Sequence, residues 1–193
     1  MGVNQLPAWL VLAGYTASAA ELNQLDGNIL NDLATTAGTG ITSAATASCT
    51  SSVEKAGALY KTTIVIDMNG FHTSVTPGDI IGDTGAANCH IGQITAARNG
   101  TIFAGSITCL EAPSGGTDDI DLYTATEATG TQSAAIGDLT SAQLIDAGAH
   151  AANAIKGLTA FPAAADSYLY LVAGGASAGD YTAGILVIEL WGK

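Results

Sequence analysis

Short runs rich in β-branched residues, separated by turn sequences, constrain this chain more than any other feature. Residues 62–67 (Thr-Thr-Ile-Val-Ile-Asp) end just before Asn69-Gly70, a dipeptide typical of tight turns between strands. Comparable runs recur along the rest of the chain, at residues 89–94, 101–110, 119–123, 168–172 and 185–191. Many short strands with frequent turns predict a mainly β fold, specifically an antiparallel β-sandwich or jelly roll.

Four local predictions follow from these runs. Residues 89–94 and 101–110 flank Asn99-Gly100 and should form a hairpin. Residues 119–123 alternate polar and apolar side chains, which predicts a half-buried strand. Residues 185–191 are the most hydrophobic run and should lie centrally in a sheet. Residues 141–148 break the pattern and resemble a short helix that ends at a glycine.

Small residues dominate the composition. The chain has 193 residues, of which 48% are hydrophobic, yet only 6% are aromatic, and 24 are glycines. Charged residues make up 11%, against about 25% in average soluble proteins. This composition favours closely packed β-layers, or packing between identical subunits, over a core of large side chains.

The charge balance argues against two classes of partner. Five Lys and Arg face 17 Asp and Glu, which gives a formal net charge of −12. Nucleic-acid affinity depends on cationic contacts to phosphates, so no nucleic-acid partner is expected. An anionic membrane surface is disfavoured for the same reason, and the apolar run at residues 7–14 is too short to span a bilayer.

The cysteines and the N-terminal residues indicate the kind of cellular compartment in which the protein folds. Cys49, Cys89 and Cys109 are an odd number without metal-binding spacing, which fits a reducing compartment better than a disulfide framework. No basic residue precedes Lys55, so a secretory signal peptide is not expected.

The chain divides by composition near Lys61. Residues 1–60 are expected to form an N-terminal arm with a short helix, and residues 61–193 the β-sandwich domain. Residues 34–58 are rich in Ala, Thr, Ser and Gly, which predicts a flexible linker or extended arm.

A helix start is visible inside this arm. Ser18 and Glu21 have the spacing of a capping box. Leu22, Leu25 and Ile29 then recur at helical spacing and form a narrow apolar seam. Gly27 interrupts this seam, either as the C-cap between two short helices or as a tolerated kink. Such a seam packs either against the parent domain or against a partner in an oligomer, and both alternatives remain open.

An acidic cluster is the best candidate for a ligand site. Asp118, Asp119 and Asp121 follow Glu111, and closely spaced carboxylates are ligands that calcium prefers. The spacing is not that of an EF-hand loop, and a solvated strand edge that discourages aggregation explains the cluster better. No metal or other cofactor is therefore expected.

Residues suited to catalysis are scattered. His72, His90 and His150 show no metal-binding spacing, and Cys109 lies in an apolar run typical of a buried cysteine. The Gly-rich stretches at residues 114–117 and 173–176 lack the lysine and helix of a phosphate-binding loop. The sequence therefore predicts a protein that is not an enzyme.

Two stretches resemble a known class of proteins. Residues 16–27 resemble the segment A-A-E-L-N-x-L-D-G that recurs in virion structural proteins of tailed bacteriophages. Residues 78–82, followed by 99–101, 109–113, 115–116 and 119–123, are similar to phage proteins described as structural or capsid-decorating. Together these stretches cover between a fifth and a third of the chain.

This resemblance implies a non-enzymatic virion component, commonly a homotrimer of β-sandwich domains. Decoration (cement) proteins of this kind lie on the capsid exterior at local three-fold positions. There they clamp neighbouring major capsid protein subunits against the internal pressure of the DNA. Such a protein is made in the host cytoplasm and ends on the capsid surface.

Apolar residues of the arm are the expected contacts with the capsid or a sister subunit, namely Trp9, Leu10, Leu12, Leu22, Leu25 and Ile29. The alternative is a short head or tail fibre that recognises a host glycan, with aromatic side chains available to stack on sugars: Tyr123, Tyr168, Tyr170 and Trp191. A third alternative is a small hydrolase or metal enzyme in which His72, His90 or His150 meets a carboxylate.

Overall fold

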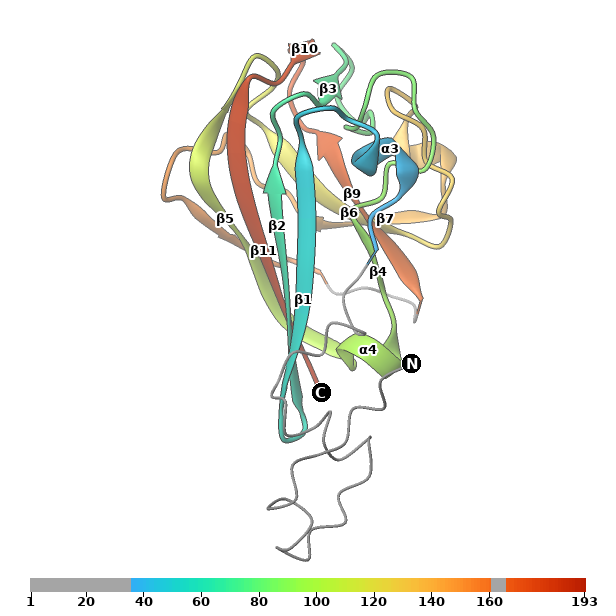
Figure 1. The fold of residues 1–193 in the computed structure, drawn as a ribbon, viewed down its shortest axis with the longest axis vertical. Helices are drawn as coiled ribbons and strands as arrows, with labels where there is room; N and C mark the ends of the chain where they lie inside the picture. Colours follow the sequence, from blue (N-terminus) through green and yellow to red (C-terminus); the bar gives the residue numbers. More distant parts are fainter. Residues whose placement is uncertain (1–35, 161–165) are drawn as a thin grey trace, which may run out of the picture.

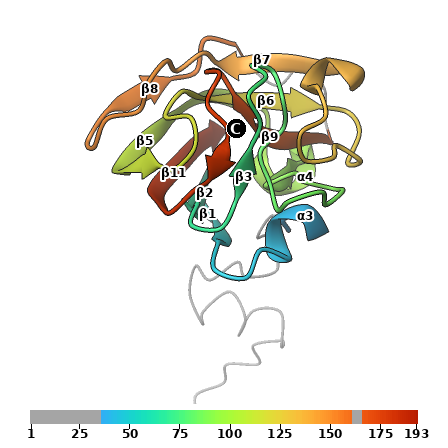
Figure 2. The same ribbon diagram turned by 90° about the horizontal axis from the view of Figure 1, so that it is seen from above.

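Two antiparallel sheets stack around one hydrophobic core in the computed structural model, which describes residues 36–160 and 166–193 (Figures 1 and 2). The larger sheet has the order β1-β2-β11-β5-β8: β1 (Ser48–Ala56), β2 (Leu59–Asp67), β11 (Ala183–Gly192), β5 (Ile102–Ser114) and β8 (Ile155–Gly157). The smaller sheet has the order β4-β9-β6-β7: β4 (Gly92–Ile94), β9 (Ser167–Ala173), β6 (Ile120–Ala125) and β7 (Ser141–Ile145). The mainly β, antiparallel prediction is confirmed, whereas the finer jelly-roll assignment is not.

Smaller elements complete the described fold. Strands β3 (His72–Thr73) and β10 (Gly179–Asp180) pair at one end of the sandwich, the upper end in Figure 1. Three short helices lie in the connections: α3 (Thr39–Thr42), α4 (Ala96–Asn99) and the 3₁₀ helix η2 (Ile136–Asp138).

Strand β11 lies at the centre of the larger sheet, as its hydrophobicity predicts. Leu186, Ile188 and Leu190 point into the core and are fully buried, while the alternate residues Val187 and Glu189 face outward and are partly exposed. This alternation follows from the two-residue period of a strand. The strand predicted at residues 62–67 is also present within β2, and Gly70 adopts a φ of 99° in the turn after it.

The two inner strands of the smaller sheet, β9 and β6, are buried on both faces. In β9, Leu169, Tyr170, Leu171 and Val172 are all fully buried. The Tyr170 hydroxyl donates to the Glu127 carbonyl at 2.8 Å, so the loop after β6 covers the outer face of this sheet. The strand predicted at residues 119–123 is present as β6, but it is buried on both faces and not half-buried.

Residues 141–148 do not form a helix. Residues 141–145 form β7, which pairs with β6 through a bulge between Leu122 and Tyr123. In so short a segment the apolar spacing fits a helix or a strand, and the available edge of β6 determines the outcome.

Asn99-Gly100 does not form a hairpin turn. The flanking strands β4 and β5 belong to different sheets, and α4 connects them. The Thr95 hydroxyl accepts from the Arg98 amide at 3.2 Å and caps the start of α4. Gly100, with φ of 67°, ends the helix. The dipeptide thus supplies a helix end, which needs the same positive φ as a turn.

The predicted linker at residues 34–58 is wrong from Gly38 onward. The Gly38 amide donates to the His90 carbonyl at 2.8 Å, and Ile41 in α3 is buried in the core. Strand β1 then pairs along its whole length with β2. A Ser/Thr-rich segment with few apolar residues suffices here because β1 is an edge strand held by backbone hydrogen bonds. The boundary expected at Lys61 falls inside β2, and the folded unit includes residues 38–60.

Candidate interaction surface

The acidic cluster does not form a ligand site in the described residues. Asp118 is exposed, Asp119 is half-buried, and Asp121 is only 7% exposed. Across residues 36–160 and 166–193, no group of three His, Cys, Asp or Glu side chains is arranged to hold a metal ion. The cluster does not lie on an open strand edge either, because β6 is an inner strand between β9 and β7.

Asp121 instead has a structural role within the smaller sheet. Its carboxylate accepts from the Gln143 side chain at 2.9 Å and from the Ala147 amide at 3.0 Å. Burial raises the pKa of Asp121, and the negative charges of Asp119 and Asp146 act in the same direction. The two hydrogen bonds oppose this rise. The carboxylate therefore fixes β7 and the turn after it against β6.

Asp119 lies against a glycine. A Cβ atom on Gly174 would come within 2.3 Å of Asp119 Oδ1, so this Gly-rich loop lets the backbone approach the carboxylate. A Cβ atom on Gly115, which has a φ of 96°, would lie 2.2 Å from the Asp180 carbonyl oxygen. Both Gly-rich stretches therefore serve close packing and turns.

The three histidines have separate surroundings. His72 Nδ1 lies 2.7 Å from Asp180 Oδ1 and links β3 to β10. His90 packs edge-to-face on Tyr168, with ring centroids 4.8 Å apart, and burial lowers its pKa. His150 is 2% exposed, and its Nε2 lies 2.9 Å from the Ile120 carbonyl.

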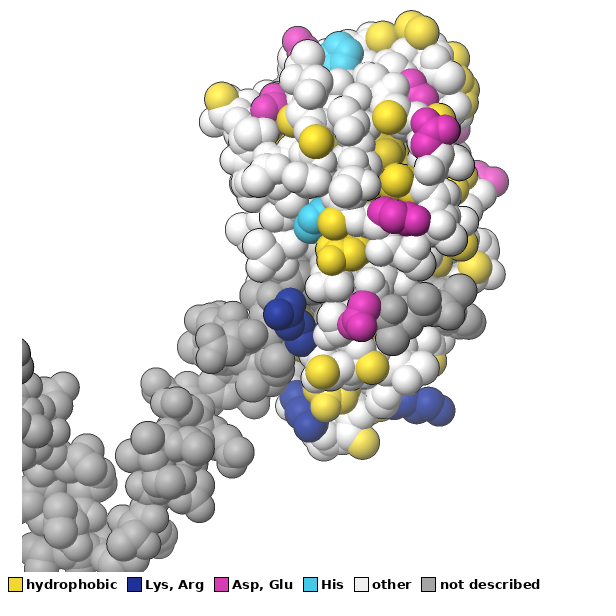
Figure 3. Space-filling model, turned by 90° about the vertical axis from the view of Figure 1, so that its right-hand side faces the viewer, with side chains coloured by type: hydrophobic (Ala, Val, Ile, Leu, Met, Phe, Trp, Pro, Cys, Tyr) yellow, Lys and Arg dark blue, Asp and Glu magenta, His cyan; other side chains and the backbone are white. Residues whose placement is uncertain are grey.

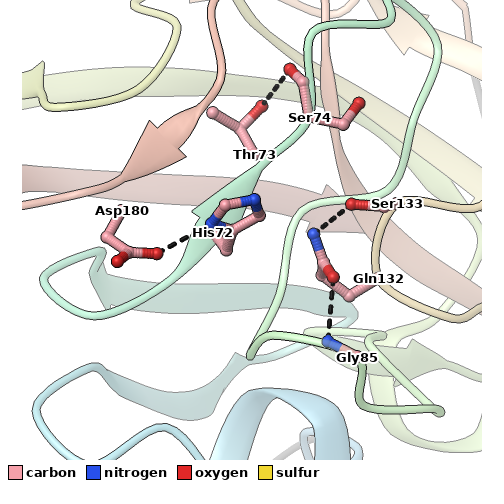
Figure 4. A network of polar contacts seen from close by, with 7 residues as sticks. All are labelled: His72, Thr73, Ser74, Gly85, Gln132, Ser133 and Asp180. Atoms are coloured by element: carbon pink, nitrogen blue, oxygen red, sulfur yellow. Dashed lines mark hydrogen bonds and ion pairs between the residues drawn. The ribbon is translucent and has the colours of Figure 1, made fainter.

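Polar contacts connect the loops at the β3–β10 end of the sandwich (Figure 4). The Gly85 amide donates to Gln132 Oε1 at 2.9 Å, and Gln132 Nε2 donates to the Ser133 hydroxyl. Nearby, the Ser43 hydroxyl donates to Asp83 Oδ2 at 2.6 Å. These contacts join segments that lie far apart in the sequence and thereby hold the loops in place.

The cysteines are free thiols in apolar surroundings. Cys89 and Cys109 are buried, and the prediction that Cys109 is a buried small side chain is confirmed. Burial raises the pKa of Cys49 to about 12 and that of Cys89 to about 11, and it raises the pKa of Cys109 as well. The neutral thiol, a weak nucleophile, is thus the stable form at neutral pH.

The aromatic candidates for sugar stacking do not share one surface. Tyr123, Tyr168 and Tyr170 lie on the outer side of the smaller sheet, where Tyr170 is fully buried. Trp191 lies on the other sheet and is 37% exposed.

Exposed apolar side chains gather on the larger sheet. Among the described residues seven large hydrophobic side chains are exposed, and six of them belong to strands of this sheet: Leu59, Val65, Phe103, Leu110, Ile155 and Trp191. The seventh, Val75, lies in a loop.

Strand register aligns part of this set. Val65 is paired with Val187, Val187 with Thr108, and Thr108 with Ile155. Val65, Val187, Thr108 and Ile155 thus form a row across the outer face of the larger sheet, from β2 to β8. Leu110 lies two residues after Thr108 on β5 and is exposed. We call the surface formed by the apolar residues Val65, Val187, Leu110 and Ile155 the outer sheet face. Its apolar side chains have no partner elements among the described residues, which is typical of a surface that binds another protein.

The expected interface residues of the arm lie outside the described residues, namely Trp9, Leu10, Leu12, Leu22, Leu25 and Ile29. The outer sheet face was not predicted from the sequence, although the pattern of residues 185–191 indicates it. In that run Ile185, Val187 and Trp191 are apolar at the positions that alternate with the core residues.

No described helix is long and apolar enough to cross a membrane. Comparison with models of protein families, with curated proteins and with solved structures finds no match to this chain.

Proposed function

We propose that this chain is a virion structural protein of a tailed bacteriophage that decorates the capsid exterior and cements neighbouring major capsid protein subunits. The outer sheet face carries the proposal, because a protein partner would cover its exposed apolar side chains. The resemblance of residues 16–27 to phage virion proteins supplies the class of assembly. In this role the protein acts without catalysis, as a homotrimer.

Cementing would work through repetition. Each copy contributes apolar contacts through the outer sheet face and through Trp9, Leu10 and Leu12 of the arm. Contacts that are weak singly become strong when a bound copy holds several subunits at once, since each further contact is intramolecular.

Copy number in purified virions tests this role. Mass spectrometry against the major capsid protein, with heads and tails separated, should find this chain on heads in numbers comparable to that protein. Absence from particles would contradict the virion role. A few copies on tails or vertices would contradict decoration and favour a fibre.

Paired variants test the surface. Ile155→Ser should lower occupancy on heads several-fold, because Ile155 is 68% exposed on the outer sheet face. Val75→Ser is the matched control, since Val75 is 64% exposed but lies off that sheet. Trp9→Ala should also lower occupancy. Equal occupancy for Ile155→Ser and Val75→Ser would remove the outer sheet face from the proposal.

A short fibre that binds a host glycan is the second candidate. Trp191 favours it, because this exposed ring lies beside Lys61, whose Nζ is 5.6 Å from the ring centroid. An exposed aromatic ring suits stacking on a sugar, whereas the charge of Lys61 is already paired with Glu189. Binding on a glycan array that Trp191→Ala abolishes would support the fibre role over decoration.

A further inference from the structure

Positive charge gathers at one end of the sandwich. Four of the five basic residues of the chain lie there, opposite the β3–β10 end: Lys55, Lys61, Arg98 and Lys193. Figure 3 shows Lys and Arg side chains at the lower end of the molecule, whereas carboxylates are spread over the face above it. We call these four residues and their apolar neighbours the basic end.

Backbone pairing brings the four residues together. Lys55 is opposite Tyr60 in the β1–β2 hairpin, and Lys61 is opposite Trp191. The Thr101 amide donates to the Lys193 carbonyl at 2.8 Å, which places Lys193 beside the end of α4 and hence near Arg98. A Cβ on Gly100 would lie 2.9 Å from both the Tyr60 ring and the Lys193 carbonyl oxygen.

Most of this charge is not neutralised within the described residues. Lys61 pairs with Glu189 at 2.5 Å, but Lys55, Arg98 and Lys193 form no ion pair in that part of the chain. Fourteen of the 17 carboxylate residues lie in the same part, so the lack of pairing does not reflect a shortage of acids.

Apolar surface accompanies the charge. Leu59, Phe103 and Trp191 are 44%, 42% and 37% exposed. Leu59 and Trp191 each lie two residues from a lysine, and Trp191 is also paired with Lys61. Phe103 precedes Ala104, the residue of β5 that is paired with Trp191. The combination of aromatic rings with cations is typical of the centre of a protein interface.

The N-terminal segment has the complementary character. Residues 18–32 contain Glu21, Asp26 and Asp32 and no basic residue. We take the alternative in which Gly27 is tolerated inside one helix. At about 100° per residue, Leu22, Leu25 and Ile29 then share an arc of about 60°. On the same helical wheel Glu21 and Asp32 flank one side of this arc and Asp26 the other. An apolar seam with carboxylates on both sides matches an apolar surface surrounded by cations.

We propose that residues 18–32 dock as a helix on the basic end of the same chain. The seam formed by Leu22, Leu25 and Ile29 covers Leu59, Phe103 and Trp191. The three flanking carboxylates then face Lys55, Arg98 and Lys193. The seam could pack against the parent domain or against a partner in an oligomer, and this proposal is the first of these alternatives. The proposal does not depend on the virion role.

The chain is long enough for this contact. Gly38 is hydrogen-bonded to His90. Arg98 at the basic end lies eight residues after His90, so the distance from Gly38 to Arg98 cannot greatly exceed about 28 Å, the length of eight extended residues. Residues 33–37 reach about 17 Å when extended, and a helix of 15 residues adds about 22 Å. Docking within one chain is also favoured by the high effective concentration of a tethered segment.

Carbodiimide cross-linking of the full-length protein tests the proposal, because it joins only carboxylates and amines in direct contact. Peptide mapping should find Glu21, Asp26 or Asp32 joined to Lys55 or Lys193. Lys156, on β8 away from this end, is the control and should not be joined to them. No cross-link to the basic end, or an equal yield at Lys156, would overturn the proposal.

Charge-reversal variants provide a second test of the proposal. The triple variant Glu21→Lys, Asp26→Lys, Asp32→Lys should raise the rate of amine acylation at Lys55 and Lys193 several-fold and leave Lys156 unchanged. A full-length variant with Lys55→Glu, Arg98→Glu and Lys193→Glu should show no cross-link to its remaining lysines. Combining the two sets should restore cross-linking with the charges exchanged. Far-UV circular dichroism confirms that each variant is folded.

Mixing isotopically light and heavy protein identifies the occupant. Docking within one chain predicts cross-links only between peptides of the same isotope, at a yield independent of protein concentration. Mixed-isotope cross-links would overturn the proposal in favour of a second copy. Lys55 and Lys193 that are freely acylated in the unaltered protein would overturn it in favour of an external acidic partner.

Discussion

Asp121 shows how a single ionisable residue depends on its surroundings in this fold. Its carboxylate is buried, accepts two hydrogen bonds and lies near two further acidic residues. Loss of hydration is the largest influence on its pKa and favours the protonated form. The ionised group thus costs free energy that its hydrogen bonds only partly offset.

Asp121→Asn should stabilise the protein at pH 7 by an amount on the order of 1 kcal/mol. The change removes the buried charge, and Gln143 can rotate its amide to accept from the new side chain. Because the folded-state pKa of Asp121 is raised, its protonation stabilises the native state below about pH 4, and this contribution is lost as pH rises through the folded pKa. The advantage of the variant should therefore shrink toward pH 4, measured by urea unfolding at both pH values.

Asp118→Asn is the matched control for this measurement. Asp118 is exposed and accepts a hydrogen bond from the His150 amide at its backbone carbonyl, which the substitution leaves in place. The free energy of unfolding should therefore change little at either pH. If Asp121→Asn were clearly destabilising at pH 7, the hydrogen bonds of the ionised carboxylate would outweigh the cost of its burial.

At the scale of elements, strands with strong alternation were predictable and short ambiguous segments were not. Strand β11 could be predicted because five buried and five outward residues alternate over its length. Residues 141–145 could not, because five residues are too few to separate a helical from a strand period. Residues 48–56 could not either, because an edge strand held by backbone pairing needs little apolar surface.

Gly40→Ala tests whether α3 belongs to the folded unit. A Cβ at this position would lie 2.4 Å from Cys89 Sγ and 2.5 Å from the Ala87 carbonyl oxygen. The added methyl group should push α3 from the core and lower the free energy of unfolding by about 1–3 kcal/mol, measured by urea denaturation.

Gly137→Ala is the control for Gly40→Ala. No atom lies within 4 Å of its added Cβ, and its φ is not positive. It should therefore leave stability nearly unchanged. Equal stability of the two variants would show that residues 38–42 are held only loosely against the rest of the fold.

At the scale of the whole molecule, charge and apolar surface are distributed unevenly. The basic residues gather at one end, and the exposed apolar side chains gather on the larger sheet. The fold creates both patterns, since each patch combines residues from three or more strands or loops.

Truncation tests the extent of the folded unit. A fragment of residues 36–193 should unfold cooperatively on heating, because the described core lies within it. A fragment of residues 61–193 should not, because it lacks α3 and β1 and leaves β2 as an open, apolar edge. Circular dichroism against temperature measures both. Equal midpoints of thermal unfolding for the two fragments would support a domain boundary at Lys61.

The sequence by itself determined the mainly β class, the position of β11 and the burial of Cys109, because these depend on local alternation and hydropathy. Only the tertiary structure decided the environments of Asp121 and the histidines, the pairing of β1 and the gathering of Lys55, Arg98 and Lys193. These features join residues far apart in the sequence, and no local pattern encodes which strand edges meet. The free energy of burial and of backbone pairing is defined only once both partners are in place.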